Sequence, residues 1–264
     1  MLIYKVDYCI ADRKNQKGII MTKTNPRMIL FDYGQTLLHE ASFDRRAALE
    51  ALTPHLYPKE NIDIDKILEF TDDLYEDLRE LAFANSVEVG FDVTLNYTLD
   101  MFGLSCDLPM LECEKLYWFS ACPGEPMPYL QETLNELKER GIRTAVVSNI
   151  SFSSEAVLAR IDSHLKHDFE FVVASSETIL RKPEKWIFLS AFKQAGLEPE
   201  DCWYVGDNIY CDLHGAFRLG MHPVFYDSGH ESFYPREEAE ITEEMRPKVD
   251  IIEHYTELLD LLEA

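Results

Sequence analysis

The chain has 264 residues, a length that favours a core domain carrying a smaller second module. Hydrophobic residues make up 46% of the sequence and aromatic residues 12%, a globular composition that excludes global disorder. The formal net charge of −23 indicates solubility and repels nucleic acids and anionic lipid surfaces, so we expect neither of these as a partner.

Residues 1–27 are predicted to form an N-terminal extension, because TKTNPR is a polar segment of turn-forming residues and the first convincing buried strand begins at Met28. Met21 and Met28 are alternative starts. The first twenty residues carry charges throughout and never form the apolar region of a signal peptide, and no later run reaches transmembrane length. The alternative is an added strand, indicated by weakly alternating apolar residues at Leu2, Tyr4 and Val6.

Five short apolar runs predict buried strands. They are MILF at 28–31, TAVV at 144–147, FVVA at 171–174, CWYV at 202–205 and HPVFY at 222–226. Runs that are apolar on both faces and separated by helices are typical of a parallel sheet that is covered on both sides.

Residues 40–122, between the first and second runs, contain no comparable strand and are predicted to be helical. Apolar residues recur at helical spacing in DIDKILEFTDDLYEDLRELAF and again in VTLNYTLDMFGL. The economical architecture is therefore a helical module inserted after the first strand.

Two further helices follow the module. Methionine and leucine side chains fall at helical spacing in 127–140, and Gly141 follows as a stop. Pro183 lies where a first-turn proline is tolerated, ahead of a helix that ends at Gly196. This alternation of strands and helices predicts an α/β fold, a Rossmann-like three-layer αβα core with a doubly wound parallel sheet.

Polar residues follow four of the predicted strands. Ligands of open α/β sheets collect at the carboxyl ends of the strands, so we expect these side chains to surround one point. They are Asp32 after the first strand, Ser148 and Asn149 after the second, Arg181 and Lys182 after the third, and Asp207 and Asp212 after the fourth.

This combination indicates a phosphate and metal site. Mg²⁺ prefers oxygen ligands and needs only one or two protein carboxylates, since water and substrate phosphate supply the rest. Ser148 and backbone N–H groups at a helix start are suited to phosphate oxygens, and Lys182 offsets their charge. Singly, each residue is more readily a helix cap, a turn former or a surface group, but their order at successive strand ends favours a site.

The same residues resemble the four motifs of the haloacid dehalogenase superfamily. FDYGQTL is similar to its first motif, hDxDGT, VVSN to the second, RKP to the third and VGDNIYCD to the fourth, GDxxxxD. CPGEPMPYLQETLNELKERGIRTAVVSN also resembles the segment that joins a helical cap to the core in the subfamily whose cap lies between motifs one and two. The resemblance implies a catalytic core of residues 28–39 and 123–264 and a helical cap of residues 40–122.

Carried over residue by residue, the resemblance implies a Mg²⁺-dependent hydrolase, most simply a phosphatase of a small phosphorylated metabolite. Asp32 would be the nucleophile that forms an aspartyl phosphate, and Lys182 would stabilise it. Ser148 would bind the phosphate, with Asn149 beside it. The metal ligands would be Asp32, the backbone carbonyl of Gly34 and Asp207. Asp212 would either contact the metal directly or position the ligands that do.

The first motif departs from the family pattern at two positions. Gly34 stands where phosphatases of the superfamily place a second aspartate, the general acid and base, and Gln35 stands where they place glycine. The metal contact survives because it is a backbone oxygen, whereas proton transfer loses its usual carrier. Nearby candidates for a substitute acid are Tyr33, His39 and Glu40, although each of them is more readily structural.

The departure leaves other functions open. One is a phosphate- and metal-binding regulatory protein without efficient turnover. Another is the chemistry of haloacid dehalogenases, enzymes of the superfamily that lack the second aspartate and work without Mg²⁺. A third is phosphonate cleavage, in which relatives use a lysine of the cap to form a Schiff base. The lysines available for the last are Lys59, Lys66 and Lys115, all among acidic or polar neighbours.

Six cysteines are scattered without a CxxC pair or zinc-like spacing, which favours a reduced, cytoplasmic protein. They are Cys9, Cys106, Cys113, Cys122, Cys202 and Cys211. The sequence predicts no oligomeric state.

Overall fold

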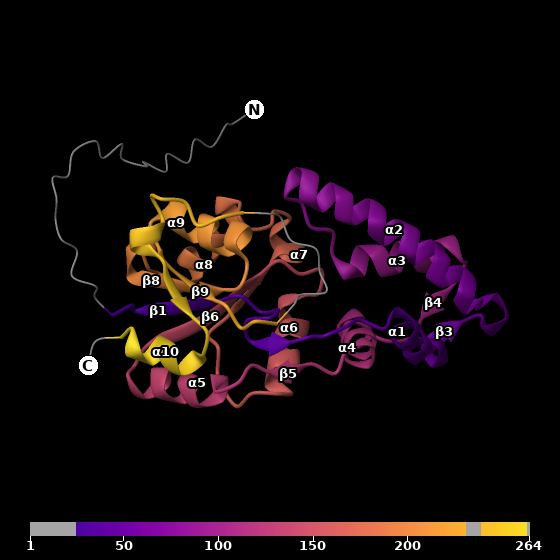
Figure 1. Cartoon of the computed structure of the whole chain (residues 1–264). Helices are drawn as coiled ribbons and strands as arrows, with labels where there is room; N and C mark the ends of the chain where they lie inside the picture. The colour runs from indigo at the N-terminus through magenta and orange to yellow at the C-terminus, as the bar shows by residue number, and fades with distance from the viewer. Residues whose placement is uncertain (1–24, 231–238, 263–264) are drawn as a thin grey trace.

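The computed structural model describes residues 25–230 and 239–262 (Figure 1). Most of the predicted extension, including the alternative strand at its start, lies outside the described residues. Of its last residues, Arg27 already hydrogen-bonds with strands of the core, since its N–H donates to the carbonyl of Asp201 and its carbonyl accepts from the N–H of Arg143.

Six parallel strands form the main sheet in the order β10-β9-β8-β1-β6-β7. They are β1 (Met28–Phe31), β6 (Arg143–Ser148), β7 (Val172–Ala174), β8 (Cys202–Gly206), β9 (His222–Tyr226) and β10 (Asp250–Ile252). The five predicted strands are confirmed, and β10 at the sheet edge is an addition. Since β1 lies between β6 and β8, the residues that follow these three strands come together at one edge.

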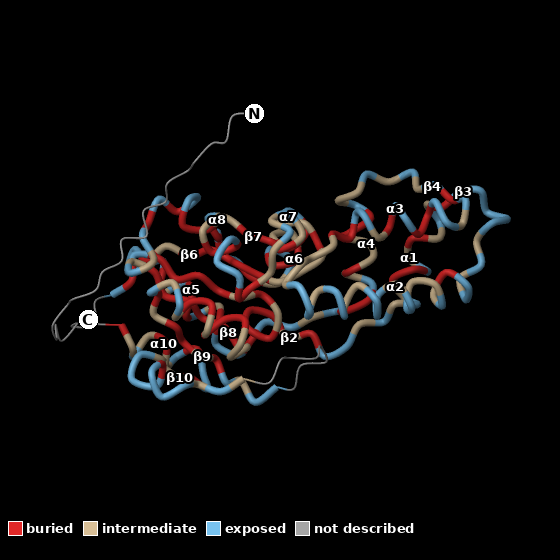
Figure 2. The backbone as a smooth tube through the Cα atoms, turned by 90° about the horizontal axis from the view of Figure 1, so that it is seen from above, coloured by how far each residue is buried: buried red, intermediate tan, exposed pale blue. Residues whose placement is uncertain are grey.

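Helices cover both faces of this sheet. They are α5 (Leu130–Glu139), α6 (Ser154–Asp162), α7 (Ser175–Thr178), α8 (Lys185–Ala195), α9 (Gly215–Leu219) and α10 (Tyr255–Asp260). Ile29 and Phe31 pack with apolar residues of α5, α6 and α10, while Met28 and Leu30 pack with those of α8 and α9. Side chains that alternate along β1 thus point to opposite faces of the sheet, and both faces are apolar. Figure 2 shows buried backbone concentrated in the sheet. The three-layer α/β prediction is confirmed.

Within the segment between β1 and β6, residues 45–121 form a helical module beside the sheet (Figure 1). Its helices are α1 (Arg45–Leu52), α2 (Ile64–Asn85), α3 (Phe91–Met101) and α4 (Met110–Ala121). It also contains two short strands, β3 (Leu56–Tyr57) and β4 (Ser105–Cys106), and the 3₁₀ turns Thr53–His55 and Lys59–Asn61. The two strands pair with each other and were not expected from the sequence.

Two chain crossings connect the module to the sheet. They run side by side as the antiparallel pair β2 (Leu38–His39) and β5 (Glu125–Pro126). The apolar core is continuous across this junction, because Tyr33, Phe152 and Trp118 belong to the same cluster as the side chains of β1.

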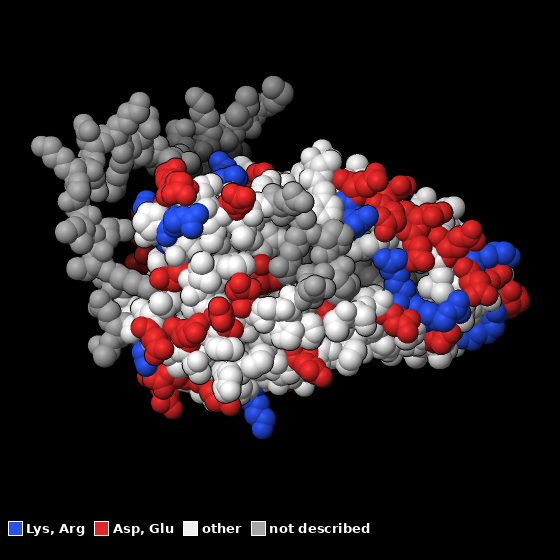
Figure 3. Space-filling model, in the orientation of Figure 1, with Lys and Arg blue, Asp and Glu red and all other residues white. Residues whose placement is uncertain are grey.

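Acidic side chains gather on the surface over α2, as Figure 3 shows, and the sequence of this helix is rich in Asp and Glu. Within the described residues, no helix has both the length and the apolar character needed to cross a membrane.

Candidate active site

Lys182 lies at the centre of a buried group of polar side chains. Its ammonium nitrogen Nζ is 2.8 Å from Oδ1 of Asp32 and 2.7 Å from Oδ1 of Asp212. The same nitrogen donates a 2.8 Å hydrogen bond to the hydroxyl oxygen of Tyr204, which donates onward to the carbonyl of Val147. Because the Lys182 side chain is only 1% exposed, protein carboxylates rather than water balance its charge.

The protonation of this group follows from burial and neighbouring charge. Burial lowers the pKa of Lys182, but the carboxylates of Asp212 and Asp32 outweigh it, so the pKa is raised above its ordinary value. Burial raises the pKa of Asp212, with Asp32 adding to the rise and Lys182 opposing it. Burial also raises the pKa of Tyr204 far above its usual range. At neutral pH the lysine is therefore charged and the phenol neutral.

Asn149 holds the backbone of Lys182 from both sides. Its side-chain oxygen accepts a 2.6 Å hydrogen bond from the N–H of Lys182, and its amide nitrogen donates a 3.0 Å bond to the carbonyl of the same residue. Ser148, the last residue of β6, is buried next to it. The amide that we expected near the phosphate is thus engaged in placing the lysine.

Asp32, Asp207 and Asp212 bring carboxylate oxygens within 4.8 Å of one another. Asp32 follows β1 and Asp207 follows β8, while Asp212 lies in the π-helix Ile209–His214. Three oxygen donors against one ammonium leave negative charge at this point, which is the donor set that Mg²⁺ prefers. The residues present therefore fit the expected metal ion.

Small and hydrogen-bonding neighbours fix these carboxylates. Gly206 makes room for Asp212, since a Cβ at position 206 would lie 2.4 Å from its Oδ2. The N–H of Asn208 donates a 2.9 Å bond to the same oxygen. The hydroxyl of Thr36 donates to Oδ1 of Asp207 at 3.1 Å, so the first and fourth motifs are bonded to each other.

The loop after β1 keeps a defined shape at the two unusual positions. A Cβ at Gly34 would meet no atom within 4 Å, and its φ lies outside the left-handed range. Gln35 has φ of 57°, a conformation that favours glycine. Two bonds hold its side chain, a 2.8 Å donation to the carbonyl of Glu40 and a 2.7 Å contact with Nδ1 of His39.

Two of the candidate substitute acids are enclosed in a separate cluster at the junction. Oε1 of Glu40 accepts from the hydroxyl of Tyr33 at 2.9 Å, from the indole N–H of Trp118 at 3.1 Å and from Arg160 at 3.2 Å. Burial raises the pKa of Glu40 and, to a greater degree, that of Tyr33. Tyr33 and Glu40 therefore have structural partners that occupy their polar atoms.

The third candidate, His39, is half-buried in β2. Its ring stacks on that of His230 with centroids 4.3 Å apart, and Nδ1 carries the hydrogen that the Gln35 oxygen accepts. Burial and His230 lower the pKa of His39, and Glu125 opposes them. The ring is therefore neutral at neutral pH.

The three lysines considered for phosphonate cleavage have partners on the module. Lys59 donates to the carbonyls of Thr53 and Pro54. Lys66 and Lys115 form ion pairs of 2.9 Å with acidic residues three positions before them in the sequence. A Schiff-base lysine needs desolvation to lose its proton, whereas the Lys66 side chain is 73% exposed.

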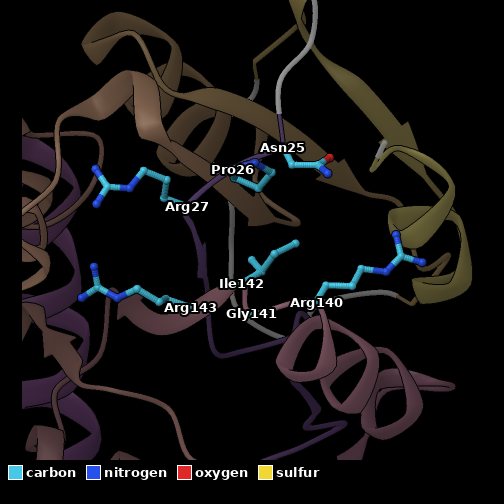
Figure 4. A pocket seen from close by; sticks show the side chains of 7 residues that line it. All are labelled: Asn25, Pro26, Arg27, Arg140, Gly141, Ile142 and Arg143. Carbon is cyan, nitrogen blue, oxygen red and sulfur yellow. The ribbon is translucent and has the colours of Figure 1, made fainter. Parts of the chain in front are cut away.

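A cavity of about 530 Å³ lies at the amino ends of β1 and β6, whereas Asp32, Asp207 and Asp212 lie at the carboxyl ends of the strands (Figure 4). It is lined by Asn25, Pro26, Arg27, Arg140, Gly141, Ile142 and Arg143. These residues precede or begin β1 and β6, whereas Asp32 and Ser148 come at the ends of those strands. The arginines are also paired, Arg27 with Asp201, Arg140 with Glu136 and Arg143 with Glu170. The cavity is therefore distinct from the site around Lys182.

Residues 26–220 match the family of haloacid dehalogenase-like hydrolases. The chain belongs to this family. Asp32, Ser148 and Asp207 lie at the carboxyl ends of β1, β6 and β8, and membership of this family makes the chain a hydrolase.

Relatives include Haloacid dehalogenase-like hydrolase domain-containing protein 3 of Homo sapiens, 32% identical over 153 residues, which are 57% of this chain and 58% of that protein. Glyceraldehyde 3-phosphate phosphatase of Methanopyrus kandleri is 27% identical over 242 residues, 89% of this chain and 97% of the relative. The enzyme of the same name from Methanothermobacter thermautotrophicus is 30% identical over 210 residues, 76% and 86% of the two chains. The match thus spans under two thirds of the human protein but most of the archaeal ones.

Solved structures of this hydrolase family share the fold. A HAD phosphatase from Thermococcus onnurineus superposes with a TM-score of 0.51 at 20% identity, covering 89% of this chain and 96% of that one. A 2-haloacid dehalogenase from Pseudomonas syringae gives a TM-score of 0.53 at 19% identity, covering 89% and 96%. Phosphatases and dehalogenases both have this architecture, so the fold alone does not separate the two reactions.

Two contributors to the site were missed in the sequence. Tyr204 lies inside the apolar run of β8 and was treated as core, although its hydroxyl binds Lys182. Thr36 was part of the first motif but had no role assigned, and the structure bonds it to Asp207. The one available signal for Tyr204 was its hydroxyl group, because a tyrosine buried in an apolar strand needs a hydrogen-bond partner for that group.

Proposed function

We propose that this chain is a Mg²⁺-dependent phosphatase of a small phosphorylated metabolite, acting through an aspartyl phosphate on Asp32. The observation that carries the proposal is the contact of one lysine ammonium, that of Lys182, with both Asp32 and Asp212 beside a third carboxylate. Such a group offers a nucleophile, a fixed positive charge and a cation site within one small volume.

In the first step an oxygen of Asp32 attacks phosphorus while the bond from phosphorus to the leaving oxygen breaks. Lys182, 2.8 Å from Oδ1 of Asp32, holds the carboxylate in place and balances charge that develops on the phosphoryl group. Ser148 is buried at the end of the neighbouring strand and would bind a phosphate oxygen. Water then attacks phosphorus of the aspartyl phosphate, which releases phosphate and restores Asp32.

The metal ligands in this proposal are Asp32, the carbonyl of Gly34 and Asp207, with Asp212 in direct contact or supporting them. A bound Mg²⁺ would supply positive charge to the phosphoryl oxygens. Asp212 has two further duties, because it pairs with Lys182 and accepts a hydrogen bond from the N–H of Asn208.

The helical module, residues 45–121, would act as the cap that selects the substrate and keeps bulk water out. Relatives named glyceraldehyde 3-phosphate phosphatase support a small sugar phosphate, such as a triose phosphate, as the substrate class. We expect low rates on such substrates, since Gly34 supplies no acid for their poor leaving groups.

A second candidate is a regulatory protein that binds phosphate and metal without efficient turnover. The observation that favours it is the lack of a proton carrier at Gly34 together with the engagement of Tyr33 and Glu40 in the junction cluster.

A screen of phosphorylated metabolites and an aryl phosphate, each with and without Mg²⁺, tests the proposal. We expect phosphate release that requires Mg²⁺ and is absent from a folded Asp32→Asn variant. Binding of Mg²⁺ and inorganic phosphate without release from any substrate would favour the regulatory protein. Turnover of a haloacid that persists in a chelator would replace the phosphatase by dehalogenase chemistry.

A further inference from the structure

The connection between α2 and α3 of the helical module docks directly on the loop that carries Lys182. The N–H of Glu88 donates to the carbonyl of Ile179 at 2.7 Å, and the N–H of Arg181 donates to the carbonyl of Ser86 at 2.8 Å. These bonds form a short antiparallel bridge between the module and the core. The module is therefore bonded to the main chain one residue before the lysine.

The side chain of Glu88 extends this contact to Ser175, the first residue of α7. Its Oε2 accepts a 2.6 Å bond from the guanidinium of Arg181 and a 2.8 Å bond from the hydroxyl of Ser175. The Ser175 hydroxyl oxygen also accepts from the N–H of Ile150 at 2.9 Å. With only 10% of the Glu88 side chain exposed, these contacts are largely withdrawn from water.

Through Ser175, the contact of Glu88 reaches the loop after β6, whose Asn149 already holds the lysine. Asn149 binds the backbone of Lys182 by two hydrogen bonds. Ile150, which follows Asn149, donates to Ser175, and Arg181, which precedes Lys182, donates to Glu88. A closed circuit of bonds results, running through Glu88, Arg181, Lys182, Asn149, Ile150 and Ser175.

We propose that Glu88 is a positioning residue for the hydrolytic reaction, by which the docked helical module holds the loop of Lys182 in its working place. The assignment rests on the proposed function for its catalytic consequence and on the bond circuit for its structural part. Glu88 acts through Arg181 and Ser175, whereas Lys182 is the group that meets the reacting atoms. A displaced module would remove these bonds from the lysine loop, leaving Asn149 to hold the backbone of Lys182.

A second contact of the module lets the role of Glu88 be tested separately from docking. Glu114 of α4 accepts from the N–H and the hydroxyl of Ser153, at 2.7 and 2.6 Å, at the start of α6. This contact and the continuous apolar core remain when Glu88 is replaced. We therefore expect a local loosening of the lysine loop rather than release of the whole module.

The experiment compares Glu88→Ala and Glu88→Gln with Glu112→Ala, a matched control that removes an exposed carboxylate paired with Lys115 on the same module. Hydrogen exchange on the full chain, resolved to the peptides that contain residues 86–91 and 176–184, should be faster in Glu88→Ala and unchanged in the control. With an aryl phosphate and Mg²⁺, kcat of Glu88→Ala should fall by about 10²-fold at similar KM, as expected for a misplaced catalytic group. Glu88→Gln keeps an oxygen acceptor and should restore most of kcat.

Unchanged exchange in a folded Glu88→Ala variant would overturn the circuit, whatever the enzyme hydrolyses. Faster exchange with unchanged kcat, or equal losses of kcat in the alanine and glutamine variants, would overturn the positioning role. If the wild type hydrolyses no phosphate ester, the phosphatase proposal fails, and exchange alone decides whether Glu88 holds the lysine loop. Ser175→Ala removes one donor of the circuit and replaces Glu88→Ala if that variant does not fold.

Discussion

The substitution Gly34→Asp tests whether the unusual first motif limits the rate. A Cβ at position 34 would meet no atom within 4 Å, and the backbone φ there lies outside the left-handed range, so a side chain can start from this position without a clash at its first atom. The new carboxyl would stand two residues from Asp32, where the family resemblance places the general acid and base. It would therefore restore a proton carrier without disturbing the bonds of Gln35.

The size of the effect depends on the leaving group. General acid and base assistance is worth about 10² to 10⁴ in rate, or roughly 3 to 5 kcal/mol of barrier. An alkyl or sugar phosphate needs that proton because its leaving oxygen is strongly basic, whereas an aryl phosphate with an acidic phenol needs little. Gly34→Asp should thus raise kcat/KM for a sugar phosphate by about 10²-fold or more and that for an aryl phosphate much less.

The assay measures kcat/KM of wild type, Gly34→Asp and Gly34→Asn on both substrate types at saturating Mg²⁺. The asparagine variant has nearly the same shape but carries no transferable proton, so it should behave as the wild type. Equal gains from both variants would mean that filling the space, not proton transfer, matters. A wild type that already cleaves sugar phosphates at ordinary enzymatic rates and gains nothing from aspartate would refute the reasoning and direct attention to His39.

Three further predictions follow from the same contacts. Asp32→Asn should abolish turnover but leave a folded protein by circular dichroism, because an amide is a poor nucleophile, and near-normal activity would remove Asp32 from that role. Asp207→Asn should raise the Mg²⁺ concentration for half-maximal activity at least about tenfold, measured by metal titration, while Asp201→Asn on the surface should not. Burial raises the pKa of Glu40, so its contribution to stability is complete below the unfolded pKa and declines as pH rises through the higher folded value. Urea unfolding across this pH window should show the free-energy difference between wild type and Glu40→Gln moving against the wild type as pH rises, and a difference that does not vary with pH would contradict this sign.

The sheet was largely predictable because its strands are apolar on both faces. The bounds of β1 and β9 coincide with the runs MILF and HPVFY. β10 escaped detection because it lies at the sheet edge, where Ile252 is buried but Ile251 is 58% exposed, so no apolar run marks it. The short strands β3 and β4 were missed for a related reason, since two residues provide too little pattern to detect.

The site was predictable to the extent that strand ends determine it. Asp32, Asp207 and Lys182 converge because they follow β1, β8 and β7, and these strands run parallel in the neighbouring order β8-β1-β6-β7, a relation that follows from the fold class. The contact of Glu88 with Arg181 was not predictable, because it depends on how the helical module docks and joins residues 93 positions apart. Asn149 was assigned to the substrate from its place in the motif, and only the geometry revealed its bonds to the lysine backbone.

The two departures in the first motif have different physical consequences. Gln35 keeps the left-handed turn at a strain of roughly 1 to 2 kcal/mol, which its bonds to Glu40 and His39 offset. The turn is therefore retained, and with it the bond from Thr36 to Asp207 that joins the first and fourth motifs. At position 34 a Cβ would meet no atom within 4 Å, so the loop has room for a side chain to begin there. In the proposed mechanism, the loop keeps Asp32 and the bond from Thr36 to Asp207 in place and lacks only the proton carrier at position 34, which is why substitution there separates chemistry from structure.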